Sequence, residues 1–192
     1  MKEIERILDF IMEIEKLKTI QRKTKPIGLN RYENSAEHSW HVCLSALMLK
    51  DFASEKVDVN KVIKMLLIHD LGEIDAGDTI IYESEKPELK EKEAQGLKRI
   101  FSFLPPGKAQ EYFELWEEFE EGETKEARFA KAIDRLPPLL HNIYGKGQSW
   151  KENNISKEDV FALNRRIEKG SKSLWEVIER KLEEAVSRGY LE

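Results

Sequence analysis

Residues 58–72 read DVNKVIKMLLIHDLG, an apolar run between a helix-capping aspartate and a glycine. The apolar side chains occupy nearly every face of a helix, which predicts a buried, central α-helix. Gly72 is a natural stop for this helix. His69 and Asp70 lie at its end, where burying an imidazole and a carboxylate is costly unless something pairs them. Taken alone, the pair also fits an ordinary helix end with a solvent-facing aspartate.

Further amphipathic segments flank this run, with apolar residues at i, i+3, i+4 and i+7. Asn34 and Glu37 have the spacing of a capping box at the start of a helix, and Pro137-Pro138 should end or kink another. A loop is expected over 74–84, with Ser84 preceding the next helix. No segment alternates with period two, so we predict an all-α fold. The expected helices cover 3–18, 35–53, 58–72, 86–103, 107–121, a segment from 124 to 137, and segments within 156–189.

These segments predict one domain over residues 1–192, a helical bundle of about seven or eight helices. Its core is expected to span about 34–145, with the C-terminal helices of 156–189 packed on it. Apolar positions in the last helices either complete the core or support a homodimer.

Composition narrows the function classes. The chain has 192 residues, 36% of them charged, and a net charge of -5, which disfavours sequence-independent binding to nucleic acid. Cys43 is the single cysteine, so no internal disulfide is possible, and no run of 18 apolar residues could span a membrane. The polar N-terminal stretch MKEIE and the lone cysteine favour a cytoplasmic location.

Two further residues give the His-Asp pair a context. His38 lies in the first turn of the preceding predicted helix, and Asp134 lies within an apolar helical segment, FAKAIDRL. A carboxylate at such a position needs a partner. Arg135 is adjacent in sequence but does not face Asp134 on a helix.

The order His38, His69-Asp70, Asp134 resembles the metal-binding signature of the HD-domain superfamily. The flanking motifs resemble the YfbR-like 5'-deoxynucleotidases of that superfamily. They are RYENSAEH at 31–38, HDLGE at 69–73, GD at 77–78, and TKEA at 124–127 leading into KAID at 131–134.

This resemblance implies one divalent metal ion with four ligands: His38, His69, Asp70 and Asp134. Two nitrogens and two oxygens suit Mn, Co, Fe, Ni, Zn or Mg, and the sequence does not choose among them. The ion would activate water for hydrolysis of a nucleoside 5'-monophosphate.

The resemblance also implies roles for residues near the metal. Glu73 would orient or deprotonate water, and Asp78 would assist proton transfer or bind the sugar side. Arg22 matches the family's substrate arginine, and its guanidinium suits phosphate oxygens. Lys131, three residues before Asp134, shares that side of the helix and is a second candidate cation. Lys23 stands where relatives have a tryptophan that rejects ribose, so preference for deoxyribose is open.

Alternatives remain at this stage. The substrate could be a nucleoside triphosphate, an alarmone or a cyclic nucleotide, although Ile74 after Glu73 argues against an alarmone hydrolase. A nucleotide-binding module without turnover is the third alternative, which Glu73 and Asp78 disfavour. Arg31 could bind phosphate or pair with Glu33 or Glu37, and we favour the structural role. A second metal at His41 and His141 is not expected, since two histidines supply too few ligands.

Overall fold

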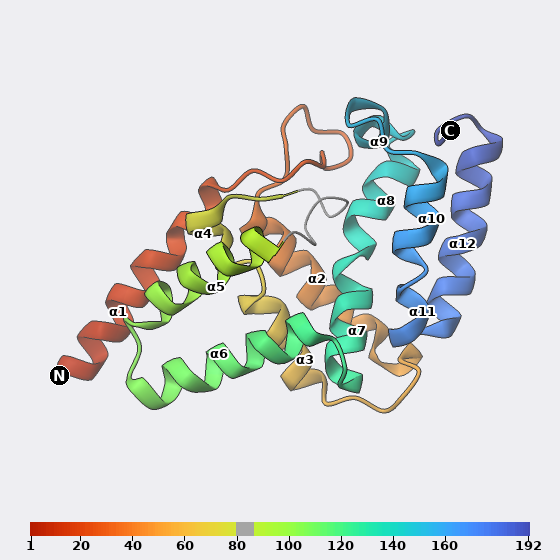
Figure 1. Cartoon of the computed structure of the whole chain (residues 1–192). Coiled ribbons are helices and arrows are strands. Elements are labelled where there is room, and N and C mark those ends of the chain that lie inside the picture. Colours follow the sequence, from red (N-terminus) through yellow and green to blue (C-terminus); the bar gives the residue numbers. More distant parts are fainter. Residues whose placement is uncertain (80–86) are drawn as a thin grey trace.

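The computed structural model describes residues 1–79 and 87–192, and within these ranges it contains helices and no β-strand (Figure 1). The predicted all-α class is confirmed. Nine of the described α-helices have eight or more residues, compared with the seven or eight expected. The α-helices are α1 Lys2–Ile14, α2 Ser35–Leu49, α3 Val59–Ile68, α4 Glu73–Ala76, α5 Pro87–Phe101, α6 Pro106–Glu121, α7 Lys125–Asp134, α8 Leu136–Tyr144, α9 Gln148–Glu152, α10 Lys157–Asn164, α11 Ile167–Gly170 and α12 Lys172–Ser187. Short 3₁₀ helices, Glu15–Thr19 and Lys50–Phe52, follow α1 and α2.

Helix α3 is central, as the sequence predicts. Its N-cap residue Asp58 accepts hydrogen bonds from two backbone amides, and Met65 and Leu66 are fully buried. Leu67, however, is half exposed, so this largely apolar helix is not buried on every side. In Figure 1, α2, α3 and α7 lie between α1 and α5 at one end and α8 to α12 at the other.

Two hydrophobic clusters meet at α3. The larger joins α2, α3 and α7 to the C-terminal helices; the smaller joins the α1 side to α5 and α6. Met65 belongs to the first cluster and Ile68, one turn later, to the second. Because α3 contributes to both clusters, the metal-site residues at its C-terminal end lie where they meet.

The segment after α3 differs from the expected loop. The helix ends at Ile68, before Gly72, and a separate helical turn, α4, begins at Glu73. Gly72 lets this segment approach α5 closely, because a Cβ at Gly72 would lie 2.7 Å from the Glu93 carbonyl oxygen. The helix start expected at Ser84 lies outside the described residues.

The C-terminal helices show what Pro137-Pro138 and two of the apolar positions in α12 do. Pro137 and Pro138 lie in the first turn of α8, where proline is tolerated, so they start a new helix after α7. Trp175 and Ile178 of α12 are buried in the larger cluster, so these apolar positions complete the core. Among the described parts of the chain, no helix has the length and hydropathy needed to cross a membrane.

Candidate metal and phosphate site

Three of the predicted metal ligands converge in the buried centre of the molecule. The Asp134 Oδ1 atom lies 2.8 Å from His38 Nε2 and 3.2 Å from His69 Nε2. His38 is fully buried, and His69 is 8% exposed. Asp70, the fourth predicted ligand, places its Oδ1 atom 3.2 Å from His69 Nε2.

Local structure explains how three helices bring these groups together. The capping box between Asn34 and Glu37 starts α2, so His38 lies in its first turn. His69 is the C-cap residue of α3, and Asp134 is the last residue of α7. These helices pack on one another through the larger hydrophobic cluster. The core therefore fixes the separation of the three side chains.

The donor set fits a divalent metal ion. Adjacent ligands about 2.0–2.2 Å from one ion lie about 3 Å apart, close to the separations seen here. The His69 Nδ1 atom is 2.9 Å from the Leu66 carbonyl oxygen, which accepts its proton and leaves Nε2 as the metal-facing atom. In the metal-free chain, Asp134 and Asp70 raise the pKa of His69 to about 9 against the opposing effect of burial. Burial also opposes ionisation of Asp134, but both imidazoles lower its pKa well below the usual range.

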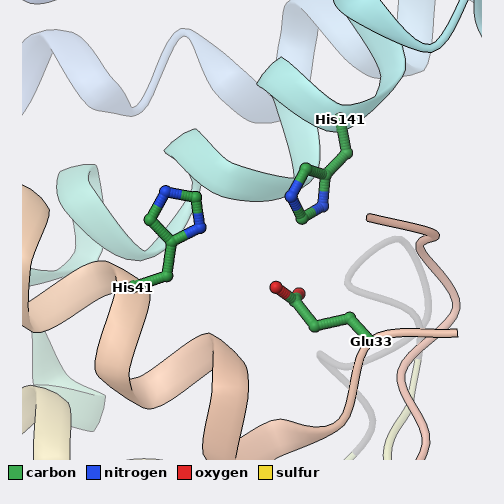
Figure 2. Close-up of side chains that lie close together, drawn as sticks. All are labelled: Glu33, His41 and His141. Atoms are coloured by element: carbon green, nitrogen blue, oxygen red, sulfur yellow. The ribbon is translucent and has the colours of Figure 1, made fainter. Parts of the chain in front are cut away.

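Glu33 lies behind His38. Its Oε2 atom is 3.7 Å from His38 Nδ1, the ring nitrogen that faces away from Asp134. A carboxylate in this position helps to set the orientation of a ligating imidazole. Glu33 also points toward the pair His41 and His141 (Figure 2). From the sequence, Glu33 was expected only as a possible partner of Arg31, which binds Glu37 instead.

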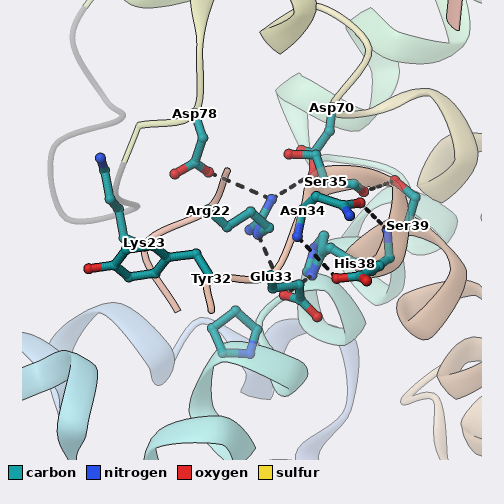
Figure 3. Close-up of polar contacts among 12 residues, drawn as sticks. Arg22, Lys23, Tyr32, Glu33, Asn34, Ser35, His38, Ser39, Asp70 and Asp78 are labelled. Atoms are coloured by element: carbon teal, nitrogen blue, oxygen red, sulfur yellow. Dashed lines mark hydrogen bonds and ion pairs between the residues drawn. The ribbon is translucent and has the colours of Figure 1, made fainter. Parts of the chain in front are cut away.

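Arg22 is the cation at the centre of the acidic site (Figure 3). Its Nη1 atom donates a 2.7 Å hydrogen bond to Asp70 Oδ2 and lies 3.8 Å from Asp78 and 3.9 Å from Glu73. Burial opposes its charge, but the surrounding carboxylates raise its pKa further. The predicted phosphate-binding arginine therefore lies beside the predicted metal ligands.

Glu73 and Asp78 are both buried near Arg22. Burial and the Asp70 charge raise the pKa of Glu73 well above its usual range, although Arg22 opposes this. Burial also raises the pKa of Asp78, again against Arg22. Ser35 donates a 2.6 Å hydrogen bond to Glu73 Oε2, a contact that no sequence signal indicated. Carboxyl groups with raised pKa are suited to proton transfer.

A cavity of about 200 Å³ opens onto this cluster. Its lining includes basic side chains from three parts of the chain: Arg22, Lys23, Lys90 and Lys131. The Lys131 Nζ atom lies 3.8 Å from Glu120 and 5.0 Å above the Phe119 ring. Burial lowers the pKa of Lys131. Arg31, by contrast, is exposed. Its guanidinium binds Glu37 at 2.6 Å, one of the two ion pairs predicted for it from the sequence.

The chain resembles proteins of known family. The HD domain family model matches residues 14–175. The 5'-deoxynucleotidase HDDC2 of Dictyostelium discoideum is 30% identical over 166 residues, 82% of this chain and 87% of that protein. Its human counterpart is 27% identical over 136 residues, 70% of this chain, and the match spans 65% of the human protein.

Solved structures resemble the whole chain. A predicted metal-dependent phosphohydrolase from Magnetospirillum magnetotacticum has a TM-score of 0.94 and 46% identity, covering 100% of this chain and 99% of that one. A conserved hypothetical protein from Pyrococcus furiosus has a TM-score of 0.63 and 30% identity, covering 91% and 98%. The extent of the family match, together with a metal-ligand cluster at the expected positions, shows that this chain belongs to the HD domain family.

Proposed function

We propose that this protein is a metal-dependent phosphohydrolase that releases phosphate from (deoxy)nucleoside 5'-monophosphates. The observation that carries the proposal is the placement of Arg22 beside a three-helix cluster of metal-ligating side chains on one cavity. The names of the relatives support the same chemistry: the HDDC2 proteins are 5'-deoxynucleotidases, and the Magnetospirillum protein is a predicted metal-dependent phosphohydrolase.

His38, His69, Asp70 and Asp134 would hold the ion, which supplies activation of water and stabilisation of phosphoryl charge. Of these ligands, Asp70 has a second partner, because Arg22 donates to its other oxygen. That hydrogen bond holds the Asp70 carboxylate in place and keeps the Arg22 guanidinium beside the residues that would hold the ion. Arg22 would therefore orient the phosphate against the metal.

Glu73 and Asp78 would divide the proton transfers. The hydrogen bond from Ser35 fixes the Glu73 carboxyl group, which would orient or deprotonate the attacking water. Asp78, whose Oδ1 atom lies 3.8 Å from Arg22, would give a proton to the departing sugar oxygen or bind that side of the substrate. Lys131 would add positive charge at the cavity wall.

Product analysis tests the proposal. We would strip metal from the full-length protein, add Mn²⁺ or Co²⁺, and assay deoxy- and ribonucleoside 5'-monophosphates, triphosphates, a cyclic nucleotide and an alarmone. Orthophosphate from the monophosphates is the expected product, with Asp134→Asn as the inactive control. Pyrophosphate or triphosphate release would support the alternative substrates instead. Nucleotide binding without any product would indicate a binding module and contradict the proposal.

Sugar selectivity depends on the residue beside Arg22. Lys23 lines the cavity, and the family resemblance of the sequence implies a tryptophan at this position. We expect Lys23→Trp to increase the ratio of kcat/KM for a deoxyribonucleotide over its ribonucleotide, because a bulky ring leaves less space near the 2'-hydroxyl. Lys18→Trp, on the exposed 3₁₀ helix, is the matched control. An unchanged ratio would show that Lys23 does not face the sugar.

The cellular location of the protein and its oligomeric state are predicted from the sequence alone. We propose a cytoplasmic enzyme. The homodimer predicted as one use of the C-terminal helices cannot use Trp175 and Ile178, which are buried in the core, whereas Val177 is 40% exposed on α12. Helix α2 offers exposed apolar side chains, Trp40, Leu44 and Met48. Sedimentation analysis of the full chain measures the oligomeric state directly.

A further inference from the structure

A second cluster of possible metal ligands lies behind the first. One atom from each of Glu33, His41 and His141 lies within 4.8 Å of the other two (Figure 2). The three side chains come from the segment before α2, from α2 itself and from α8. The sequence had suggested only the two histidines, which are too few to bind an ion; the fold supplies the third group.

Glu33 is buried and lacks a close partner. It is 3% exposed, and its Oε2 atom has no hydrogen-bond partner among the described residues. The Oε2 atom lies 3.7 Å from His38 Nδ1 and 3.9 Å from Arg22 Nε, and both distances are longer than a hydrogen bond. A buried carboxylate oxygen without a close partner is costly, and a bound cation would remove this cost.

The histidines are also arranged as ligands. The His141 Nδ1 atom is buried without a hydrogen-bond partner among the described residues. Burial lowers the pKa of His141, which favours the neutral ring that can ligate a metal ion. The rings of His41 and His141 are tilted by 41°, with centroids 6.0 Å apart, and Figure 2 shows the Glu33 carboxylate pointing into the space between them.

The backbone holds Glu33 in place. Its amide donates to the Thr24 carbonyl oxygen at 2.9 Å, and its own carbonyl oxygen accepts from the Arg22 amide at 2.8 Å. On the other side, α2 packs against α8, which fixes the histidines relative to each other. Ligands of one ion lie about 3.0–3.5 Å apart, so only small side-chain rotations are needed to close the site.

We propose that Glu33, His41 and His141 form a second metal site, separate from the one at Asp134, that takes a transition-metal ion such as Zn²⁺. Two imidazoles and one carboxylate favour Zn²⁺, Co²⁺, Ni²⁺ or Fe²⁺ over Mg²⁺ or Ca²⁺, which prefer oxygen ligands. Three protein ligands leave further coordination positions for water. Glu33 links the two sites, because it also faces His38.

Counting bound ions tests this site. The metal-free, full-length protein is dialysed against Zn²⁺, and the ions per chain are measured by mass spectrometry. We expect two ions in the wild type, one in His41→Gln/His141→Gln, one in Asp134→Asn, and none when all three changes are combined. Tyr144→Phe, on the same helix as His141, is the control and should keep two ions. Mg²⁺ should not compete for the second ion.

Imidazole NMR gives a second measurement on the unaltered chain. The protein has four histidines, so resonances of His41 and His141 can be assigned with the single variants. These two should shift together as the second equivalent of Zn²⁺ binds. One bound ion in the wild type, or two ions that persist in the double histidine variant, would overturn the second site. Metal counting does not depend on turnover, so an inactive protein with two ions would contradict only the proposed function.

Discussion

Asp134 is the residue on which the proposed metal site depends most. Its carboxylate is the group shared by the two imidazoles, and it reaches them from a different helix than either. The Asp134 side chain is 18% exposed and its partners can all bind metal, so a cation that joins them would stabilise this cluster. The contribution of Asp134 to metal affinity can be measured with asparagine, which has nearly the same shape as aspartate.

Asp134→Asn should abolish high-affinity binding of Mn²⁺ at this site. The amide has nearly the same size but no charge, so we expect at least about a 100-fold weaker Kd. Isothermal titration with Mn²⁺ measures the change. Asp9→Asn, at an exposed position of α1, is the control and should bind like the wild type. Equal affinity in Asp134→Asn would place the ion elsewhere.

Arg22 should stabilise the fold as well as bind phosphate. Its removal leaves Asp70, Glu73 and Asp78 close together without their cation. We expect Arg22→Gln to lower the free energy of unfolding by about 3–5 kcal/mol in the metal-free protein. Urea unfolding provides the measurement. Arg31→Gln removes an exposed, solvent-screened ion pair and should change stability little; equal losses in both variants would contradict this role for Arg22.

Glu93 should make the metal-free protein less stable as the pH rises. Burial, with Glu120 and Asp70 nearby, raises the pKa of Glu93 to about 7, above its ordinary value near 4.5. The folded state therefore holds the proton more tightly, and stability falls from about pH 4.5 to about pH 7.

Glu93→Gln removes that pH-dependent loss. At pH 8 the variant should be more stable than the wild type by about 1 kcal/mol, a figure reduced for partial solvent screening. At pH 4 the two should differ little. Thermal unfolding across this range tests the prediction, with Glu91→Gln on the exposed face of α5 as control. A constant difference at every pH would rule out titration of Glu93 as the cause.

At the scale of elements, the contact between α4 and α5 positions Glu73. Helix α4 has only four residues, and its place depends on a close approach to α5. A Cβ at Gly96 would lie 2.9 Å from the Gly72 carbonyl oxygen and 3.2 Å from the Asp75 Cβ atom. Two glycines on facing segments therefore set how far Glu73 reaches into the site.

Gly96→Ala should push α4 away from α5. We expect a loss of about 1–3 kcal/mol in the free energy of unfolding and a lower kcat, because Glu73 moves with α4. Gly107→Ala lies on α6, where an added Cβ meets nothing within 4 Å, and it should be neutral or slightly stabilising. Stability and turnover of the two variants are compared side by side. A fully active, stable Gly96→Ala protein would show that the contact does not position Glu73.

At the scale of the whole molecule, the two hydrophobic clusters share α3 and meet near the metal ligands. An ion held by α2, the end of α3 and the end of α7 would tie three helices together. We therefore propose that residues 1–192 unfold as one cooperative unit.

Metal removal should lower the Tm. At a Mn²⁺ concentration of 100 times Kd, binding contributes about 2.7 kcal/mol, which corresponds to a shift of about 5–10 °C for a chain of this size. Calorimetry with and without a chelator measures both the shift and the number of transitions. In Asp134→Asn most of the shift should disappear. Two separate transitions would contradict a single cooperative domain.

The sequence by itself determined the helical class and the candidate ligands. Apolar periodicity depends only on local spacing, so it located most of the long helices but not α4, α8 or α9, and the His-Asp pair at the end of α3 marked the site. The sequence could not show that α3 ends before Gly72, that Pro137 begins α8, or that Leu67 is exposed, because packing against neighbouring segments decides these features.

Only the tertiary structure decided which distant side chains meet. It placed Arg22 against Asp70, Ser35 against Glu73, and Glu33 between His38 and the pair His41 and His141. The residues in each of these contacts lie on different segments of the chain, and their separation is set by how helices pack around the core. Sequence spacing encodes which face of one helix a residue occupies, but it does not encode the distance between helices.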